Sequence, residues 1–407
     1  MTARRRVLLL APASSYRVAD FVRAATRMGV DLTVASDGAQ FLGGRPVIPV
    51  RAGDPARGAE LIASRSGPMD AVVAADAPML PLAAAVAAAL GLPRNPADAV
   101  LSAADKARQR QRWAAANVAQ PRFKVVPASA PDPAIRQAAA AIGFPCVVKA
   151  VSLSASQGVL LADDADQAVR AAARIRLVLA DAGQPPGEPL LVEGYLHGPE
   201  LSIDGLLTDG DLTPLAIFDK PAMTDGPTFE ETLLVTPSRL PGPVQAEAVR
   251  TAGRAARALG LQTGPVHAEL RVTSTGTAML ELAARSIGGL CSRALRFPRG
   301  RSLEELILAS ALGQPVLARA RQAPQPSGVF MLPVPRAGVL RAVEGRDDAE
   351  AVPGITGVTI TIPPGRMVRP LPDGDQYLGF IFAEAATPGE VETALTTASQ
   401  RLRAIIE

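Results

Sequence analysis

The chain has 407 residues, and the 48% of them that are hydrophobic suffice for buried cores in about two to four domains. Basic and acidic residues nearly balance, with a net charge of +3, and no basic stripe interleaved with aromatic residues occurs. This pattern excludes a nucleic-acid partner. The two cysteines, Cys146 and Cys291, are too far apart in sequence for a metal motif or a disulfide framework, which favours a reducing cytoplasm.

The beginning of the chain imitates a secretory leader without matching one. The apolar run that follows Arg4 to Arg6 is short and ends at Pro12, so a buried strand is the better interpretation. The longest apolar segment, residues 82–92, falls well below the roughly 20 residues that cross a bilayer. We therefore expect no transmembrane helix and no membrane partner.

Lysine is scarce in this sequence. The chain contains only Lys106, Lys124, Lys149 and Lys220, whereas arginine fills nearly every other basic position. GC-rich coding explains such a bias without function. If arginine replaced lysine wherever either cation would serve, the remaining lysines are candidates for phosphate contacts, which suit a compact ammonium.

The N-terminal segment, residues 1–102, alternates apolar strands with helical stretches. RRRVLLLAP, a helical stretch to Met28, VDLTVAS and later DAVVAAD follow one another, which predicts a Rossmann-like parallel sheet with helices. A Gly-x-Gly-x-x-Gly fingerprint does not follow the first strand, so we expect a substrate or scaffold role for this domain.

The pattern changes from residue 103 onward, beginning with a polar helix. Residues 144–162 predict two strands around a small-residue loop, not a Walker phosphate loop, and helices are expected over 163–182 and 243–259 with a Gly/Pro-rich loop over 220–236. A Pro-rich stretch after Leu312 marks a boundary. We predict an α/β (α+β) protein with domains at 1–102, 103–316 (with a lid at about 120–193) and 325–407, the last a small α+β domain.

The strongest local signal is a predicted hairpin over residues 264–285. If residues 274–276 form a three-residue loop, Thr273 pairs with Thr277 and Glu269 lies opposite Glu281, with His267 on the same face. Paired like charges destabilise a sheet unless they share a cation or a proton. Mg²⁺ is the natural candidate for that cation, because carboxylates are among its usual ligands. A solvated hairpin with exposed glutamates is the alternative.

Arg285 ends the second predicted strand, and Gly288 and Gly289 follow it. An arginine beside glycines that let a ligand approach the backbone suits oxyanion binding, although a structural arginine at a turn has the same appearance. Glu230 and Glu231 form an acidic pair in the predicted loop, where they would meet an amino group or simply face solvent.

At this point the sequence resembles the ATP-grasp superfamily over most of its length. The features that carry the resemblance occur in that superfamily's order: Asp-Lys at Lys106, Val-Val-Lys-Ala at Lys149, the loop to Gly158, EGYL with GPELSIDG, and the paired glutamates. The resemblance implies an ATP-grasp fold.

The resemblance also implies roles in phosphate and metal binding. Lys106 and Lys149 would contact the α- and β-phosphates of ATP, and the loop from Ser156 to Gly158 would close over them. Glu269 and Glu281 would carry Mg²⁺, with Mn²⁺ also open. A surface position is the alternative for Lys106.

For the nucleoside, the resemblance implies that backbone at Gly194 and Leu196 holds adenine. Glu193 would lie beside the adenine amino group, and Glu200 would bind the ribose hydroxyls. Strand-end or surface acids are the alternative for both glutamates. Lys220 would reach a phosphate or an acyl oxygen, or would be a surface lysine, and Lys124 is expected to be exposed.

The sequence departs from the superfamily at its second metal carboxylate. Where Glu-x-Asn-x-Arg is common, residues 281–285 read Glu-Leu-Ala-Ala-Arg, so Ala283 replaces a metal ligand. This pattern is similar to the Glu-x-Ala-Ala-Arg of bacterial L-amino acid ligases, whose C-terminal domain also looks similar to residues 327–407. The similarity implies that Arg285 holds the acyl-phosphate; His267 would orient substrate or be merely packed.

The resemblance therefore predicts a cytoplasmic enzyme that uses ATP and Mg²⁺ to join a small-molecule carboxylate to an amine, releasing ADP and phosphate. A homodimer is left open. Two alternatives remain: a carboxylase of the biotin-carboxylase or purine-pathway kind, and a non-catalytic ATP-binding regulator, which Ala283 motivates.

Overall fold

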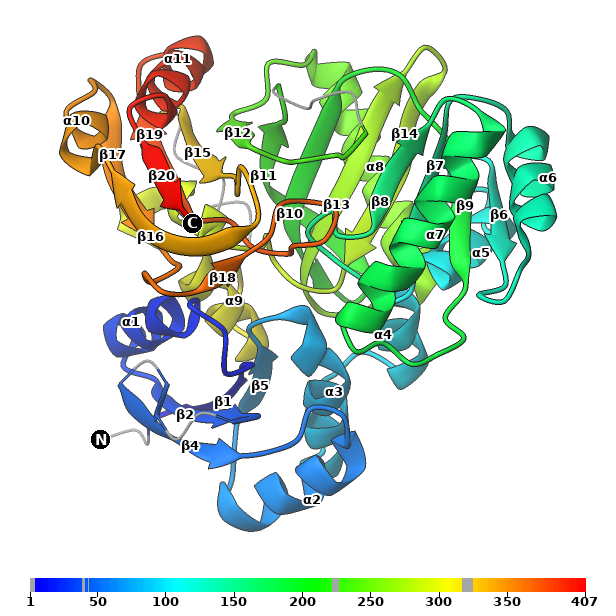
Figure 1. The fold of residues 1–407 in the computed structure, drawn as a ribbon. Coiled ribbons are helices and arrows are strands. Elements are labelled where there is room, and N and C mark those ends of the chain that lie inside the picture. Colours follow the sequence, from blue (N-terminus) through cyan, green and yellow to red (C-terminus); the bar gives the residue numbers. More distant parts are fainter. Residues whose placement is uncertain (1–3, 39–40, 43, 222–226, 317–324) are drawn as a thin grey trace.

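A computed structural model describes residues 4–38, 41–42, 44–221, 227–316 and 325–407. The N-terminal segment, the lid and the C-terminal segment surround a central sheet (Figure 1). The prediction of a mixed α/β architecture is confirmed. Among the helices of the described residues, none combines the length and the apolar character that a bilayer crossing needs.

The N-terminal segment is built on a sheet with strand order β3-β4-β2-β1-β5. Neighbouring strands pair in parallel as predicted, except β3, which forms an antiparallel edge with β4. Alternate residues of β1 pack against α1 on one face and against α2 and α3 on the other. The elements are β1 (Arg6–Leu10), α1 (Val18–Met28), β2 (Asp31–Ser36), β3 (Phe41–Leu42), β4 (Arg45–Pro49), α2 (Pro55–Arg65), β5 (Ala71–Ala74), η1 (Ala77–Met79) and α3 (Leu80–Ala89).

Two helices lead into the lid. The polar helix predicted from residue 103 is α5 (Lys106–Ala115), which begins three residues later because the Asp105 side chain caps it by accepting from the amide of Arg108. A separate helix, α4 (Ala97–Ala103), precedes it. The lid sheet has the antiparallel order β6-β9-β7-β8. Its elements are β6 (Phe123–Val126), α6 (Asp132–Ile142), β7 (Cys146–Ala150), β8 (Val159–Ala162), α7 (Ala165–Asp181) and β9 (Leu190–Gly194). The strand-loop-strand over 144–162 is thus confirmed.

A central sheet continues from the predicted middle domain into the C-terminal segment. Its strand order is β14-β13-β10-β11-β12-β15-β19-β17, and β12 pairs with β15 across the predicted boundary. The loop predicted over 220–236 therefore ends in a strand, β12. The middle part consists of β10 (Glu200–Thr208), β11 (Asp211–Asp219), β12 (Leu233–Thr236), α8 (Gly242–Leu259), β13 (Gly264–Thr273), β14 (Gly276–Ala283), η2 (Cys291–Ala294), η3 (Pro298–Gly300) and α9 (Leu303–Ala311).

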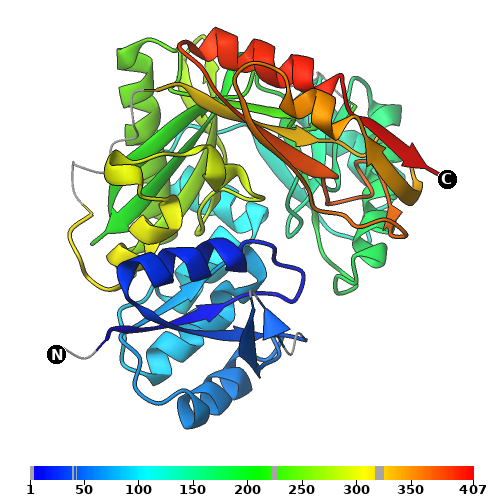
Figure 2. The same cartoon turned by 90° about the vertical axis from the view of Figure 1, so that its left-hand side faces the viewer.

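The C-terminal segment adds strands to the central sheet and a smaller sheet of order β18-β16-β20. Helix α11 packs on β15 and β19 (Figure 2). The prediction of an α+β segment is confirmed, while the domain limits stay a prediction. Its elements are β15 (Ser327–Leu332), β16 (Gly338–Glu344), α10 (Arg346–Glu350), β17 (Ile355–Ile360), β18 (Met367–Val368), β19 (Gly379–Glu384), α11 (Pro388–Ser399) and β20 (Arg403–Ile406).

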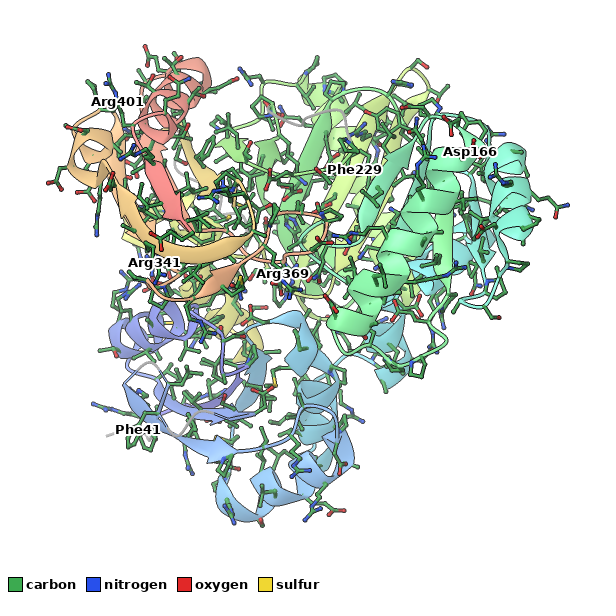
Figure 3. The ribbon with its side chains drawn as sticks, in the orientation of Figure 1. Phe41, Asp166, Phe229, Arg341, Arg369 and Arg401 are labelled. Atoms are coloured by element: carbon green, nitrogen blue, oxygen red, sulfur yellow. The ribbon has the colours of Figure 1, made fainter. Side chains whose placement is uncertain are left out.

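The tip of the lid contacts the C-terminal segment. The amide of Gly158 donates to the carbonyl of Pro372 at 3.1 Å, and Gln157 Nε2 donates to the carbonyl of Asp373 at 2.8 Å. Arg369, labelled in Figure 3, forms an ion pair of 2.9 Å with Asp181 at the end of α7. These contacts hold the lid closed over the central sheet.

Candidate functional site

A cleft of about 900 Å³, counted with its open mouth, lies between the lid and the central sheet. Predicted site residues supplied by the lid, by α5 and by the sheet face it together. Those that line it are Lys106, Lys149, Ser156, Glu193, Gly194, Leu196, Glu200, Glu269, Glu281 and Arg285. Gly158, His267, Gly288 and Gly289 lie beside the cleft without lining it.

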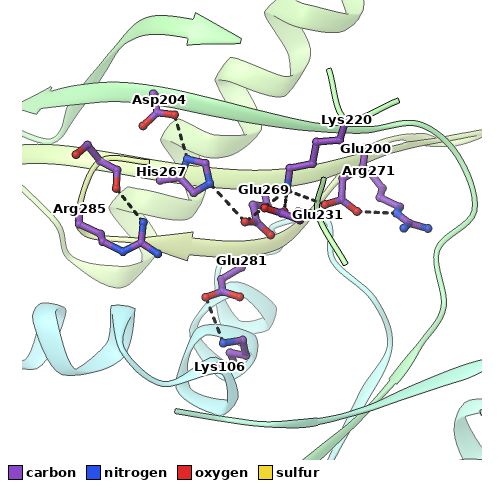
Figure 4. Close-up of polar contacts among 11 residues, drawn as sticks. Lys106, Glu200, Asp204, Lys220, Glu231, His267, Glu269, Arg271, Glu281 and Arg285 are labelled. Atoms are coloured by element: carbon purple, nitrogen blue, oxygen red, sulfur yellow. Dashed lines mark hydrogen bonds and ion pairs between the residues drawn. The ribbon is translucent and has the colours of Figure 1, made fainter. Parts of the chain in front are cut away.

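Lys106 enters the cleft from the first turn of α5. Its Nζ donates to the carbonyl of Leu153 in the lid loop at 2.5 Å and forms an ion pair of 3.2 Å with Glu281 (Figure 4). The residue is 6% exposed, so the surface alternative is wrong. One ammonium therefore links the helix, the lid loop and the hairpin.

Lys149 lies on the lid strand β7 against a buried carboxylate. Its Nζ is 2.5 Å from Glu193 Oε2, and the other oxygen of Glu193 pairs with Arg110, which is 0% exposed and lies over the Trp113 ring. Burial disfavours the charge of Glu193, but Arg110 and Lys149 outweigh it and hold its pKa below the usual range. Burial also lowers the pKa of Lys149, against the opposing effect of Glu193. Glu193 thus fixes the lysine in place.

The ammonium of Lys220 lies among carboxylates from separate elements. It is 2.9 Å from Glu200 Oε1 and 3.5 Å from Glu269 Oε1, and it also pairs with Glu231 (Figure 4). Burial disfavours its charge, but these acids raise the pKa of Lys220 well above its ordinary value. The surface alternative for Lys220 is therefore wrong.

The carboxylates around Lys220 could hold a metal ion. Oxygens of Glu200, Glu231 and Glu269 lie within 4.8 Å of one another, and hard oxygen ligands are those that Mg²⁺ takes. Burial raises the pKa of Glu231, whereas Lys220 and His267 outweigh burial and lower that of Glu269. Glu269 belongs both to this cluster and to the predicted metal pair.

Glu200 is also held by Arg271, its cross-strand neighbour. Arg271 Nε donates to Glu200 Oε2 at 3.1 Å, and Arg271 Nη1 donates to the carbonyl of Leu196 at 2.6 Å. The guanidinium lies over the Tyr195 ring, 4.8 Å from its centroid, and that ring stacks on Phe229. The segment after β9 is therefore held by a cation and aromatic rings.

His267 bridges Asp204 and Glu269. Its Nδ1 is 3.1 Å from Asp204 Oδ2, and its Nε2 is 3.4 Å from Glu269 Oε1. Burial disfavours its charged form, but Asp204 and Glu269 raise the pKa of His267 to about 9. The ring can therefore orient the Glu269 carboxylate. His267 does not line the cleft, so the substrate-orienting role expected for it gains no support.

The hairpin brings Glu269 opposite Glu281, as predicted, by a different register from the one expected. Thr273 pairs with Gly276, not with Thr277, so the loop is one residue shorter than predicted. A bulge between Glu269 and Leu270 restores the offset. The carboxylates share one face because these deviations cancel.

Arg285 brings a positive charge to the end of β14. It donates to the carbonyl of Ser286 at 2.8 Å, and it forms no ion pair with an acid of the described residues. The space beside Gly288 is occupied by this guanidinium, whereas a side chain at Gly289 would collide with Phe380 at 2.7 Å. Gly289 therefore meets a packing need, and the ligand role expected for it gains no support.

Models of known families match this chain in two places. Residues 142–294 match the ATP-grasp domain, and residues 330–407 match the L-amino acid ligase C-terminal domain 2. The chain therefore contains an ATP-grasp domain, followed by a domain of the kind found at the C-terminus of L-amino acid ligases. Its resemblance to the L-amino acid ligases is thereby confirmed in its C-terminal segment.

Solved structures share this ATP-grasp fold over the whole chain. The L-amino acid ligase from Bacillus licheniformis superposes with a TM-score of 0.82 at 21% identity, covering 100% of both chains. A carboxyaminoimidazole ribonucleotide synthase from asperigillus clavatus, complexed with ATP, gives 0.74 at 16% identity over 98% of this chain and 99% of its own. At these identities the likeness shows the fold.

Curated relatives of this ATP-grasp protein match in part. Carnosine synthase 1 of Gallus gallus is 34% identical over 221 residues, 51% of this chain and 24% of that protein. The alanine–anticapsin ligase of Bacillus subtilis (strain 168) is 28% identical over 258 residues, 59% of this chain and 52% of that protein. The chain thus spans a quarter to about half of these relatives.

Some residues of this ATP-grasp site escaped sequence reasoning. Glu231 had solvent exposure as one of its two interpretations, Arg110 carried no recognised motif, and Asp204 lies inside GPELSIDG but was assigned no role of its own. Lysine scarcity was the useful signal: Lys106, Lys149 and Lys220 are all buried at the cleft, while Lys124 is exposed as expected.

Proposed function

We propose that this protein is an ATP-dependent ligase that joins a carboxylate to an amine through an acyl-phosphate, acting on amino-acid-like substrates. The observation that carries the proposal is the cleft itself, which gathers buried lysines, clustered carboxylates and an arginine without an acidic partner among the described residues. The named relatives, an alanine–anticapsin ligase and a carnosine synthase, support amino-acid-like substrates.

ATP and Mg²⁺ suit the residues of this cleft. ATP would supply the phosphoryl group that activates the carboxylate, and Mg²⁺ would neutralise phosphate charge. Lys106 and Lys149 would bind the α- and β-phosphates, the loop around Ser156 would close over them, and Glu200 would bind ribose. Since Lys220 already pairs with the carboxylate cluster, an arriving divalent ion would compete with its ammonium for the oxygens of Glu269.

The adenine would lie at the hinge after β9. The backbone of Gly194 and Leu196 lines the cleft there. The amide of Gly194 donates to the carbonyl of Arg122, so its own carbonyl is the group left for adenine. Glu193 is engaged by Lys149 and Arg110, and we therefore propose that it positions the phosphate-binding lysine more than it reads the adenine amino group.

Arg285 is the residue we propose to hold the acyl-phosphate. Its guanidinium lines the cleft and can offer paired donors to phosphoryl oxygens, a geometry that a lysine does not reproduce. With the carboxylate and the phosphoryl donor aligned, the side chains need supply only orientation and charge. The closed lid would keep water from the acyl-phosphate.

The test is ADP release from ATP and Mg²⁺ across amino acids, singly and in pairs, with bicarbonate and no-substrate controls. We expect release that requires a pair, together with an amide of matching mass. Release with bicarbonate alone would instead make the protein a carboxylase. Tight ATP binding without ADP release on any substrate would overturn the ligase proposal in favour of a binding protein.

A further inference from the structure

A second cavity lies between α1 and the chain that leads into α9. It measures about 830 Å³, counted with its open mouth, and its lining residues all differ from those of the ATP cleft. Arginines dominate its wall. Those that line it are Arg23, Arg27, Arg293, Arg296 and Arg301.

The charges around this cavity do not balance. Asp20 is shared by Arg23 and Arg293, with the latter at 3.1 Å, and Arg27 pairs with Glu305 at 2.8 Å. Arg296 pairs with Glu384 at 3.7 Å. Among the described residues at this cavity, five arginines therefore face the carboxylates of Asp20, Glu304, Glu305 and Glu384. Burial, followed by the nearby Arg293, holds the pKa of Arg23 below its ordinary value. Positive charge is therefore in excess.

Two charged side chains of the wall have atoms without partners. Glu304 is 2% exposed, and its Oε1 accepts no hydrogen bond from the described residues. Arg301 Nε is likewise a buried donor that lacks an acceptor there. Unsatisfied buried groups of this kind cost stability, so each atom would gain from a ligand group of the opposite hydrogen-bonding character.

We propose that this cavity binds a small oxyanion that carries its own hydrogen-bond donor. Arg301 and its neighbours would bind the oxyanion, because guanidinium groups match phosphate and carboxylate oxygens. The ionised Glu304 carboxylate can only accept hydrogen bonds, so the ligand must donate one to it. Monohydrogen phosphate has this chemistry through its hydroxyl, and a free amino acid has it through its ammonium; sulfate lacks it.

The experiment is isothermal titration calorimetry on the full chain at neutral pH, without nucleotide, using inorganic phosphate, sulfate and L-alanine as probes. We expect phosphate or alanine to bind at least about tenfold more tightly than sulfate, because a charge-assisted hydrogen bond is lost with sulfate. Whichever of phosphate and alanine binds identifies the source of the oxyanion.

Matched variants locate the binding. Arg301→Gln should weaken it about tenfold or more, whereas Arg299→Gln, an exposed arginine of the same segment outside the cavity, should leave it unchanged. Glu304→Gln should abolish the discrimination against sulfate, because its amide can donate. Equal affinity for phosphate and sulfate in the unsubstituted protein would overturn the proposal.

A further variant separates this cavity from the catalytic cleft. Arg285→Gln should retain the binding, because Arg285 does not line the second cavity. Loss of binding in Arg285→Gln with retention in Arg301→Gln would assign the oxyanion to the cleft and refute the inference, as would the absence of any saturable binding. The titration requires no turnover, so its outcome is independent of the proposed ligase activity.

Discussion

Replacing Lys220 by methionine removes the cation from a buried carboxylate cluster. The Lys220 side chain is 2% exposed, and its Nζ lies 2.9 Å from Glu200 and 3.5 Å from Glu269 while also pairing with Glu231. At an effective dielectric constant of about 20, each such contact is worth roughly 5 kcal/mol before desolvation is subtracted. Breaking a buried ion pair costs a net ~3–5 kcal/mol. If one carboxylate takes up a proton when the ammonium is removed, the cost lies at the lower end of this range.

The assay is thermal unfolding, with Lys124→Met as the matched control because that lysine is exposed. We expect Lys220→Met to melt well below the unsubstituted protein and the control to match it. Mg²⁺ should then raise the melting temperature of Lys220→Met more than that of the unsubstituted protein, because the ion can replace the ammonium among the oxygens. Equal melting of the two lysine variants would refute the reasoning.

Three further predictions concern nucleotide binding and turnover. Lys149→Met should weaken ATP binding at least about tenfold, through loss of a charged phosphate contact, with Lys124→Met unchanged in the same nucleotide titration. Arg285→Lys should lower kcat for amide formation about tenfold or more while nucleotide affinity is retained, since an ammonium keeps the charge but not the paired donors; equal loss of both would contradict an acyl-phosphate role. Asp373→Ala breaks an ion pair with Arg174 and should raise substrate-independent ADP release. The increase should stay below about fivefold, because exposed pairs contribute roughly 0.2–1 kcal/mol. Unchanged release would show that this ion pair does not restrain the lid.

Local periodicity predicted many elements of this fold but not the details of their pairing. The hairpin shows why: the offset between strands depends on the loop and on any bulge, and the sequence of residues 270–280 marks neither. The loop was predicted one residue too long, and the bulge beside Glu269 compensated. Helix α9 was left unassigned, although Ser302 and Glu305, which form a capping box at its start, are a local sequence signal that could have marked it.

The site residues show the same contrast between local sequence patterns and long-range contacts. Lys106 and Lys149 stand beside recognisable local patterns, and the structure brings both to the cleft. Glu231 could not be found in this way, because its partner Lys220 stands 11 positions away and its other neighbours, Glu200 and Glu269, come from β10 and β13. Arg110 faces into the protein from a helix whose polar sequence suggested a solvated surface, and it is the carboxylate of Glu193, 83 positions away, that makes its burial tolerable.

The closed cleft depends on segments that are distant in sequence. The amide of Leu161 in lid strand β8 donates to the carbonyl of Pro227, and the lid loop donates to the carbonyls of Pro372 and Asp373. Arg369 pairs with Asp181 at the end of α7. The segment that matches the L-amino acid ligase C-terminal domain supplies the last three of these contacts and also extends the central sheet. Under the proposed function, an acyl-phosphate would survive only where water is excluded, so this enclosure would couple the C-terminal segment to the yield of amide per ATP consumed.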